Sequence, residues 1–326
     1  MINLYDQPED SIDVLIVGSS PAYADINTNV LWEEYGIAAY NLCSPVEPYW
    51  CTYYRLKEAL KTQHPRIILL DAKASTYKRN PSLTGNICQS IYGIQGSENF
   101  LGAVYASFDT QEEAEDFLYF TMPEFHSQLL QKDASEFESS SFWRKRGSCW
   151  KGYVEIDNEE RHEKPTVIFN KVRRNMNEQE TEYAQKIFDL AYQQGIEIML
   201  IGFPNPDYAN DHMYYNMLWS IAEEYSITGI NYNDPDIRFG LKYSRHFADW
   251  QHLNVTGSIK FSRKLAEDLK ERYHLPDRRG DPYYASYDEC ARQWYELYPT
   301  FESAHADDNP LNWFDESESQ PETSGI

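Results

Sequence analysis

An aspartate and a histidine stand three residues apart in the stretch RHFADWQHLN at 245–254. Asp249 could accept a hydrogen bond from one ring nitrogen of His252 and leave the other nitrogen free to act as a base. Such a base can remove the proton from a serine hydroxyl, which is a weak nucleophile on its own. The spacing is common by chance, so it predicts chemistry only if a serine faces the pair.

A serine that could face the pair follows the apolar run IDVLIVG at 12–18, in the stretch VGSSPAY. A continuous apolar run that ends in glycine predicts a strand buried on both faces. A turn at Gly18 would place Ser20 in the cleft at the strand's carboxyl end, where the Ser20 amide can help to stabilise an oxyanion. The turn could instead bind phosphate, although the chain lacks a G-x-G-x-x-G pattern and a Walker lysine. It could also be an ordinary polar connection.

Strand and helix patterns alternate along most of the chain, which predicts an open, mostly parallel α/β sheet covered by helices on both faces. Asn177 and Glu180 fit a capping box before one helix, and Gly195 fits a left-handed cap after it. Ligands bind such sheets at the carboxyl ends of the strands, so Ser20 and the Asp–His pair should share one edge. The predicted strands are 12–18, 37–42, 66–71, 196–204 and 227–232, and the predicted helices are 27–35, 49–63, 178–194, 211–225 and 255–273.

Two regions interrupt or follow this pattern. We expect a main domain at 1–274, with an insertion at about 74–165 that either folds over the active edge of the sheet as a lid or is a purely structural subdomain. His126 lies in the insertion and is a candidate substrate contact. Residues 275–326 form an acidic C-terminal extension that we expect to be partly disordered, at least from about 303, with aromatic residues that could dock on the body.

The composition excludes several classes of function. A net charge of -23 opposes binding to nucleic acid and to anionic lipid surfaces. The five cysteines include no C-x-x-C pair and predict neither a zinc site nor a disulfide framework. The sequence as written has no apolar run long enough to span a bilayer and no export signal, so it predicts a soluble protein. No cofactor is expected.

A metal site is the alternative interpretation of the histidine-rich stretch. His246, Asp249 and His252 recur every three residues, and Asp211 and His212 could add ligands. Such spacing suits a metal on a regular helix, but this stretch precedes the predicted helix instead of occupying it. The sequence therefore favours the serine interpretation over the metal site.

These residues together resemble a known family. Gly-Ser-Ser at 18–20 after a buried first strand, with DWQHLN at 249–254 before the last helix, resembles the SGNH (GDSL-like) hydrolase superfamily. The closer likeness is to a bacterial branch with Gly-Ser-Ser in place of Gly-Asp-Ser, which includes teichoic acid D-alanylation and alginate O-acetylation proteins. The resemblance covers most of residues 8–273, and it implies a three-layer αβα sandwich with a five-stranded, flavodoxin-like sheet.

The resemblance also implies roles for individual residues in a serine acyl-transfer mechanism. Ser20 would be the nucleophile, His252 the general base, and Asp249 the residue that orients the imidazole. One oxyanion donor would be the Ser20 amide. The second would be a backbone amide after the second strand, at Cys43 or Ser44, where the family usually has glycine.

Three departures from the family pattern support a second hypothesis. Besides Cys43-Ser44, the asparagine block expected after the third strand is missing, and Pro21-Ala22-Tyr23 stands where we expect a histidine at 21. Tyr23 is a candidate substrate contact. The alternative to an enzyme is therefore a noncatalytic SGNH-like protein for glycan binding or assembly, with a degraded oxyanion hole.

The resemblance also suggests a biological setting. The expected substrate is an acylated glycan or another cell-surface polymer, and the reaction is hydrolysis or transfer of an ester-linked acyl group, commonly acetyl. The expected partner is a membrane acyl-transport protein. Relatives usually act outside the cytoplasm through an N-terminal membrane anchor, and the sequence leaves the compartment open.

Overall fold

The architecture is a five-stranded parallel sheet between two layers of helices. The computed structural model describes residues 2–78, 84–121, 150–165 and 170–298. The strand order is β2-β1-β3-β4-β5, the flavodoxin-like doubly wound order. The strands are β1 (Val14–Gly18), β2 (Ala39–Cys43), β3 (Ile67–Asp71), β4 (Glu197–Gly202) and β5 (Thr228–Asn231).

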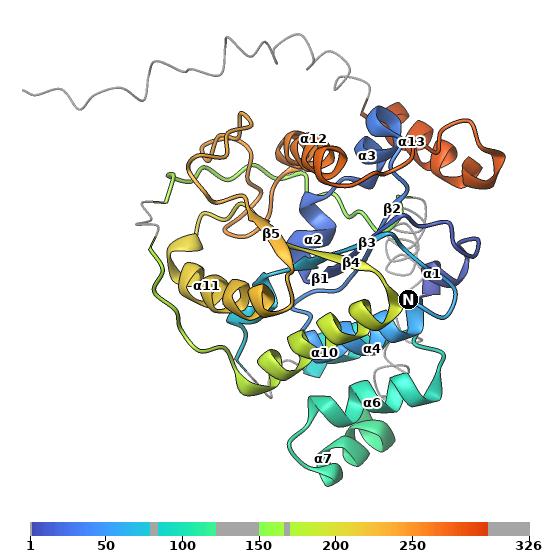
Figure 1. Ribbon diagram of the computed structural model, residues 1–326, viewed down its shortest axis with the longest axis vertical. Coiled ribbons are helices and arrows are strands. Elements are labelled where there is room, and N and C mark those ends of the chain that lie inside the picture. The colour runs from blue at the N-terminus through green and yellow to red at the C-terminus, as the bar shows by residue number, and fades with distance from the viewer. Residues whose placement is uncertain (1, 79–83, 122–149, 166–169, 299–326) are drawn as a thin grey trace, which may run out of the picture.

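The helices form two layers, one on each face of the sheet, and further helices lie at the two ends of the described chain. Helices α4, α10 and α11 cover one face of the sheet, and α2, α3 and α12 cover the other (Figure 1). The helices of these two layers and the helices at the two ends of the described chain are α1 (Ile2–Tyr5), α2 (Ser20–Asp25), α3 (Thr28–Tyr35), α4 (Tyr49–Ala59), α10 (Glu178–Gln194), α11 (Tyr208–Glu224), α12 (Val255–Arg272) and α13 (Ala285–Leu297). A short 3-10 turn, η4 (Pro282–Tyr284), precedes α13.

Alternating strand residues explain why both faces are covered. In β1, Leu15 and Val17 belong to the core under α4 and α10, whereas Val14 and Ile16 belong to the core under α12. All five residues of β1 are buried, as the continuous apolar run predicted. The predicted α/β fold with a parallel sheet and helices on both faces is thus confirmed.

The helix that precedes β4 confirms one predicted cap and corrects another. The Asn177 side chain caps α10 by accepting a hydrogen bond from the Gln179 amide, and Gly195 adopts the left-handed conformation after its last turn. Glu180 does not complete a capping box. Its carboxylate accepts a hydrogen bond from the Tyr49 amide at 2.9 Å and thereby joins α10 to the start of α4.

The described residues of the insertion after β3 form two parts, a group of helices beside α4 and a separate segment at 150–162. Its helices α6 and α7 lie outside α4 (Figure 1), and α6 packs along that helix. They therefore form an added layer and do not cover the sheet's carboxyl edge. The described elements of this region are η1 (Lys73–Thr76), α5 (Thr84–Ile91), α6 (Ser97–Ser107), α7 (Gln111–Asp116) and the π-helical turn η3 (Phe117–Thr121). Residues 150–162 take a separate course, which is described with the site.

The first part of the C-terminal extension docks on the body. Trp32 of α3 stacks on the rings of Tyr284 and Tyr287, with centroids 6.1 and 5.0 Å away, and its Nε1 donates to Asp288 at 2.9 Å. Trp294 is fully buried. Residues 275–298 are therefore part of the packed structure, whereas the residues predicted to be disordered from about 303 lie outside the described part.

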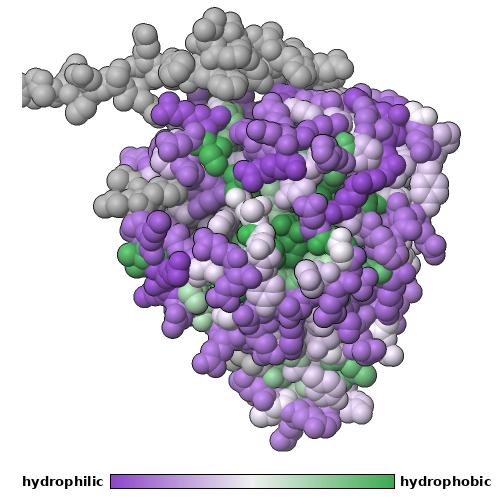
Figure 2. Space-filling view, in the orientation of Figure 1, coloured by the Kyte–Doolittle hydropathy of each residue, from purple (hydrophilic) through white to green (hydrophobic). Residues whose placement is uncertain are grey.

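A cavity of about 390 Å³ opens at the amino ends of β4 and β5. Its wall includes Tyr192, Tyr225, Arg272 and Tyr273. Figure 2 shows hydrophobic residues gathered near the middle of an otherwise largely hydrophilic face, over the region of β4 and β5 in Figure 1. Because all strands run in parallel, this cavity is at the amino edge of the sheet, opposite to the carboxyl ends of β1 and β2.

No described helix combines the length and the apolar composition that crossing a bilayer requires.

Candidate active site

The structure brings Asp249 and His252 together in the loop between β5 and α12. The Asp249 Oδ2 lies 2.8 Å from the His252 Nδ1. The other carboxylate oxygen, Oδ1, accepts the backbone amides of Gln251 and His252 at 2.7 and 2.9 Å. One carboxylate thus shapes the loop and orients the ring, which explains why a three-residue spacing works here without a helix.

The opposite nitrogen of the histidine is poised to accept a proton. Because Nδ1 faces a carboxylate, it carries the ring proton in the neutral imidazole and leaves a lone pair on Nε2. The His252 Nε2 is buried and has no hydrogen-bond partner among the described residues. A buried acceptor without a partner costs free energy, and a catalytic role is one of the explanations for keeping it. This nitrogen therefore has the state that a general base needs.

The electrostatics keep Asp249 ionised. Partial burial would raise the pKa of this carboxyl, but the hydrogen bonds from His252 and from the Gln251 amide outweigh burial and lower it. The carboxylate therefore stays charged at neutral pH and can stabilise an imidazolium on His252.

The loop that carries His252 is tied to the helix that carries Ser20. The amide of Leu253 donates to the Oδ1 of Asp25, the last residue of α2, at 2.8 Å. Burial raises the pKa of Asp25 well above its usual value, and its Oδ2 has no hydrogen-bond partner in the described part of the chain. Sequence reasoning missed Asp25, because only the fold shows that this acid meets the loop.

The two serines after β1 have different roles. The Ser19 hydroxyl donates to the Oδ2 of buried Asp71 at 2.5 Å, and the Ser19 amide donates to the same oxygen at 3.0 Å. Ser19 is fully buried, so its hydroxyl is structural. Ser20 is the first residue of α2 and is 8 % exposed, and its amide lies in the first turn, where helical amides lack intrahelical partners.

Tyr23 links the predicted site residues in space. Burial raises the pKa of Tyr23 to about 12, and its ionisation is also influenced by the nearby Ser20, Cys43 and Asp249. A group that senses all three lies close to the predicted nucleophile, to the end of β2 and to the acid of the pair. The structure thus gathers Ser20, Tyr23, Cys43 and Asp249 at one edge of the sheet, as their positions in the sequence predicted.

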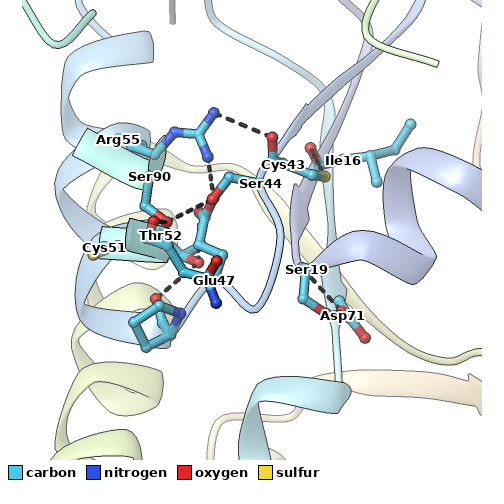
Figure 3. Close-up of polar contacts among 12 residues, drawn as sticks. Ile16, Ser19, Cys43, Ser44, Glu47, Cys51, Thr52, Arg55, Asp71 and Ser90 are labelled. Carbon is cyan, nitrogen blue, oxygen red and sulfur yellow. Dashed lines mark hydrogen bonds and ion pairs between the residues drawn. The ribbon is translucent and has the colours of Figure 1, made fainter. Parts of the chain in front are cut away.

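Ser44 requires a correction. Its amide was predicted as an alternative oxyanion donor, but it donates to the Gly18 carbonyl at 3.3 Å and extends the β1–β2 ladder. Its hydroxyl lies 2.6 Å from the Oε2 of Glu47 and 2.6 Å from the Ser90 hydroxyl (Figure 3). Both polar groups of Ser44 are therefore engaged within the fold, and the Cys43 amide stays a prediction.

A buried ion pair supports this end of β2. Glu47 and Arg55 are 0 % and 4 % exposed, and Arg55 also reaches the Cys43 carbonyl at 3.5 Å (Figure 3). Thr52 donates to Glu47 at 2.9 Å. Burial raises the pKa of the Cys43 thiol well above its usual value, so Cys43 stays a thiol and is a poor nucleophile. Sequence reasoning did not foresee this ion pair.

Residues 150–162, here called the strap, run across the candidate site. The Val154 amide donates to the carbonyl of Tyr23 at 3.0 Å, and the Asn41 amide of β2 donates to Lys151 at 2.9 Å. Further along, the Glu160 amide donates to Phe247 at 2.9 Å. The strap thus contacts β2, α2 and the His252 loop, which is the position expected of a lid. His126, the other predicted contact from the insertion, lies outside the described residues.

The strap carries a buried histidine. The His162 side chain is 1 % exposed, and neither ring nitrogen has a hydrogen-bond partner in the described structure. The ring packs on Trp250, which is 59 % exposed, with centroids 4.4 Å apart. Glu160 Oε1 lies 3.7 Å away and would pair only with a charged ring.

Replacing His162 with Leu is expected to raise the free energy of unfolding by about 1 kcal/mol. The change removes two unpartnered buried nitrogens at about 1–3 kcal/mol each, while losing a ring contact of about 0.5–1.5 kcal/mol and part of the fit. Urea titration measures the change. His64→Leu is the control, because His64 is exposed and its pairing with Asp10 should contribute little. A destabilised His162→Leu would contradict the prediction.

The metal alternative gains no support from the geometry. His246 Nδ1 accepts the Lys242 amide at 2.9 Å, and His212 Nδ1 lies 2.9 Å from the Ala209 carbonyl in α11. Across the residues that the structure describes, no group of three or more His, Cys, Asp or Glu side chains could hold a metal ion.

The comparisons with known proteins assign no family to this chain, so its class rests on the fold and the site. A search of protein-family models and a search of curated proteins each found no match to this chain. What defines the chain is therefore an α/β sandwich with a flavodoxin-like parallel sheet and an aligned Asp–His pair at the edge where Ser20 begins a helix.

Proposed function

We propose that this protein is a serine-dependent O-acyl esterase or acyltransferase that acts on an acylated glycan or another cell-surface polymer. The observation that carries the proposal is the state of His252: its Nδ1 is held by Asp249 at 2.8 Å, and its buried Nε2 has no described partner. The substrate class, and a membrane acyl-transport protein as a partner, come from the resemblance to SGNH hydrolases.

The proposed reaction starts at Ser20. His252 Nε2 takes the proton as the Ser20 oxygen attacks the ester carbonyl, and the carbonyl oxygen becomes an oxyanion. Collapse of the tetrahedral intermediate expels the alcohol, which receives the proton from Nε2, and leaves an acyl-serine. Water completes hydrolysis, or a second hydroxyl group completes transfer, with His252 again acting as the base.

The second candidate is a noncatalytic glycan-binding or assembly protein. The occupied Ser44 amide favours it, because one of the two predicted positions for an oxyanion donor is engaged in the ladder. Losing a single oxyanion donor can cost about 10²–10³-fold in turnover. The two candidates therefore differ in whether Ser20 reacts at all.

Covalent labelling distinguishes the two candidates. The wild-type protein is expected to hydrolyse p-nitrophenyl acetate and acetylated oligosaccharides, and to be labelled at Ser20 by a fluorophosphonate, as shown by peptide mass spectrometry. Ser20→Ala should lose both ester hydrolysis and fluorophosphonate labelling and keep its glycan binding. Ser220→Ala is the control, because that hydroxyl bonds to a carbonyl within α11. A wild-type protein with neither turnover nor label would favour the noncatalytic candidate.

A further inference from the structure

The loop that carries the proposed base has a tryptophan at its tip. The Ala248 amide donates to the His252 carbonyl at 2.9 Å, and Phe247 and Leu253 form an antiparallel bridge. The segment between them is therefore a short hairpin with Trp250 in its turn. The Cα atoms of Trp250 and His252 are at most about 7 Å apart, because two residues of extended chain reach no further. The tryptophan thus lies directly beside the proposed base.

Trp250 is the most exposed tryptophan among the described residues, at 59 %. Trp219 is partly buried, and the others are at most 6 % exposed: Trp32, Trp50, Trp150 and Trp294. Leaving a large apolar ring in water forgoes burial that would stabilise the fold, and tryptophan is enriched among the residues that dominate binding surfaces. Its exposure beside the candidate site therefore favours a role in binding.

The strap holds the indole in place from one side. The His162 ring packs on the Trp250 ring with centroids 4.4 Å apart and the two planes at 62°. The His162 amide donates to the Tyr243 carbonyl at 3.0 Å, and the Asn158 Nδ2 donates to the Ala248 carbonyl at 2.7 Å. The strap and the hairpin are therefore joined around the indole, which is fixed before any ligand arrives.

His162 is a costly support for this ring. Its side chain is 1 % exposed, and neither ring nitrogen has a hydrogen-bond partner in the described part of the chain. Buried polar atoms in that state call for an explanation. A leucine would fill the space without unpartnered nitrogens, but it could not make the edge-to-face contact that aromatic pairs prefer. Support of Trp250 explains why an aromatic ring stands here at a cost to stability.

The surroundings of the indole suit a sugar better than an apolar ligand. The carboxylate of Glu160, which lies 3.7 Å from His162, is 44 % exposed, and that of Asp249 is 42 % exposed. The exposed Gln251 side chain has no hydrogen-bond partner among the described residues. A sugar offers C–H groups to an aromatic face and hydroxyl groups to polar side chains around it. An acyl chain would leave those polar groups without partners.

We propose that Trp250 is a glycan-binding subsite on which a sugar ring of the substrate stacks, next to the unit whose ester is attacked, and that His162 is its positioning residue. This inference rests on the proposed function and narrows the polymer to a glycan. The net charge of -23 favours neutral sugars over a polyanion. A ring stacked away from the reacting atoms binds alike in the ground state and the transition state, so its loss should raise KM more than it lowers kcat.

The test is Trp250→Ala, measured on two kinds of acetyl ester. On short O-acetylated xylo-, manno- and cello-oligosaccharides, KM for the one that the wild type prefers should rise by about tenfold or more, the effect of truncating a tryptophan that dominates a binding surface. On ethyl acetate, which has no ring to stack, the loss in kcat/KM should be much smaller. Trp250→Phe keeps an aromatic face and should recover part of the affinity for the oligosaccharide.

Tyr192→Ala is the matched control. Tyr192 of α10 is 84 % exposed and lines the cavity at the amino ends of β4 and β5, far from the hairpin. It should leave KM unchanged on both kinds of ester. A Trp250→Ala enzyme with near wild-type KM for the oligosaccharides would overturn the subsite. Equal losses on ethyl acetate would also overturn it, because they would show that Trp250 only shapes the hairpin that carries His252.

Two variants of His162 test its positioning role. His162→Leu, although it is expected to stabilise the fold, should raise KM for the oligosaccharide by a few fold, because the indole loses the ring that orients it. His162→Phe retains a ring and should keep KM near wild type. A merely structural His162 would leave KM unchanged in the leucine variant, and that result would overturn the positioning role.

Binding without turnover separates this inference from the proposed function. Ser20→Ala should bind the same oligosaccharides in calorimetric titrations, and adding Trp250→Ala should weaken that binding by about tenfold. If the wild-type protein neither turns over nor labels but its binding depends on Trp250, the proposed enzyme fails and the subsite stands. If Ser20 reacts and binding does not depend on Trp250, the subsite fails and the enzyme stands. Absence of binding to all three oligosaccharides would overturn the subsite as well.

Discussion

Asp249→Asn is expected to lower turnover on acetyl esters by about 10⁴-fold, the loss seen when the acid of a serine triad becomes an amide. The amide nitrogen of the new side chain would donate to His252 Nδ1 and force the ring proton onto Nε2. A protonated neutral Nε2 cannot accept the proton of Ser20. The loss would therefore come from the wrong tautomer, in a folded protein.

The structure explains why the loop should survive this change. The Asp249 Oδ1 accepts the amides of Gln251 and His252, and the carboxamide oxygen of asparagine can accept both. Asp234→Asn is the matched control, because its Oδ1 also accepts an amide two residues later, that of Asp236, at 2.9 Å, in the same region after β5. The control should keep full activity. An Asp249→Asn enzyme within tenfold of wild type would show that Asp249 does not set the tautomer.

The Asp249–His252 pair also predicts how stability and activity change as the pH falls. Because hydrogen bonding holds the pKa of Asp249 below its usual value in the folded state, the pair stabilises the fold above the unfolded pKa of this group, and that stability is lost as the pH falls through the folded pKa. Since Asp249 is 42 % exposed, the effect on stability should be small. The effect on activity should be much larger, because the orientation of His252 depends on the charged form.

The strands were predictable because their burial leaves a local signature. The predicted strand at 66–71 corresponds to β3 at Ile67–Asp71, and the predicted helix at 178–194 matches α10. A parallel strand covered on both faces is apolar at nearly every position, so it stands out in a sequence without any alignment. The parallel direction of the strands and the placement of Ser20 at the carboxyl edge of the sheet follow from the alternation of strands and helices, whereas the flavodoxin-like strand order was implied by the resemblance.

The errors share one physical cause, which is contact between residues far apart in the sequence. Glu180 has the right spacing for a capping box, but the Tyr49 amide, from a helix packed against it, takes its carboxylate. The sequence allowed aromatic residues of the extension to dock on the body, but no local pattern identified Trp32 as the residue on which Tyr287 would stack. Local patterns state what a segment can do, and tertiary packing decides which partner it meets.

In the candidate site, too, local features were predictable from the sequence and contacts between distant residues were not. Asp249 and His252 were predictable because three residues separate them and one loop holds them. Asp25 was not, because it accepts the Leu253 amide from a segment more than two hundred residues away. The Ser44 amide was misassigned because the β1–β2 ladder continues one bond past Cys43. The residues that perform the proposed chemistry are thus easier to find than those that position them.

Gly18 is expected to be the most sensitive position in the β1 turn, and Gly18→Ala should lower the free energy of unfolding by about 3–5 kcal/mol. Its φ of +138° lies in a region that other residues rarely adopt. A methyl group there would lie 2.3 Å from the Asp71 Cβ, which is closer than carbon atoms can approach. The substitution therefore combines backbone strain with a clash inside the core.

The clash would reach the site through a short chain of contacts. Asp71 is buried and holds both the hydroxyl and the amide of Ser19, which stands at the N-cap position of α2 directly before Ser20. Moving Asp71 away from the new methyl group would loosen those bonds and the start of α2, which carries the proposed nucleophile Ser20. Urea titration should show the loss of stability, and fluorophosphonate labelling at low denaturant should show the loss of reactivity.

Gly195→Ala separates the cost of backbone strain from the cost of a steric clash. Gly195 also has a positive φ, +67°, but a methyl group there would have no heavy atom within 4 Å. Its cost should be that of the left-handed conformation alone, about 1–2 kcal/mol. A similar small cost for Gly18→Ala would mean that Asp71 yields readily, and the Ser19–Asp71 contact would then be a poor explanation of how the turn presents Ser20. A much larger cost would show that the turn is rigid, which a nucleophile aimed at a fixed base requires.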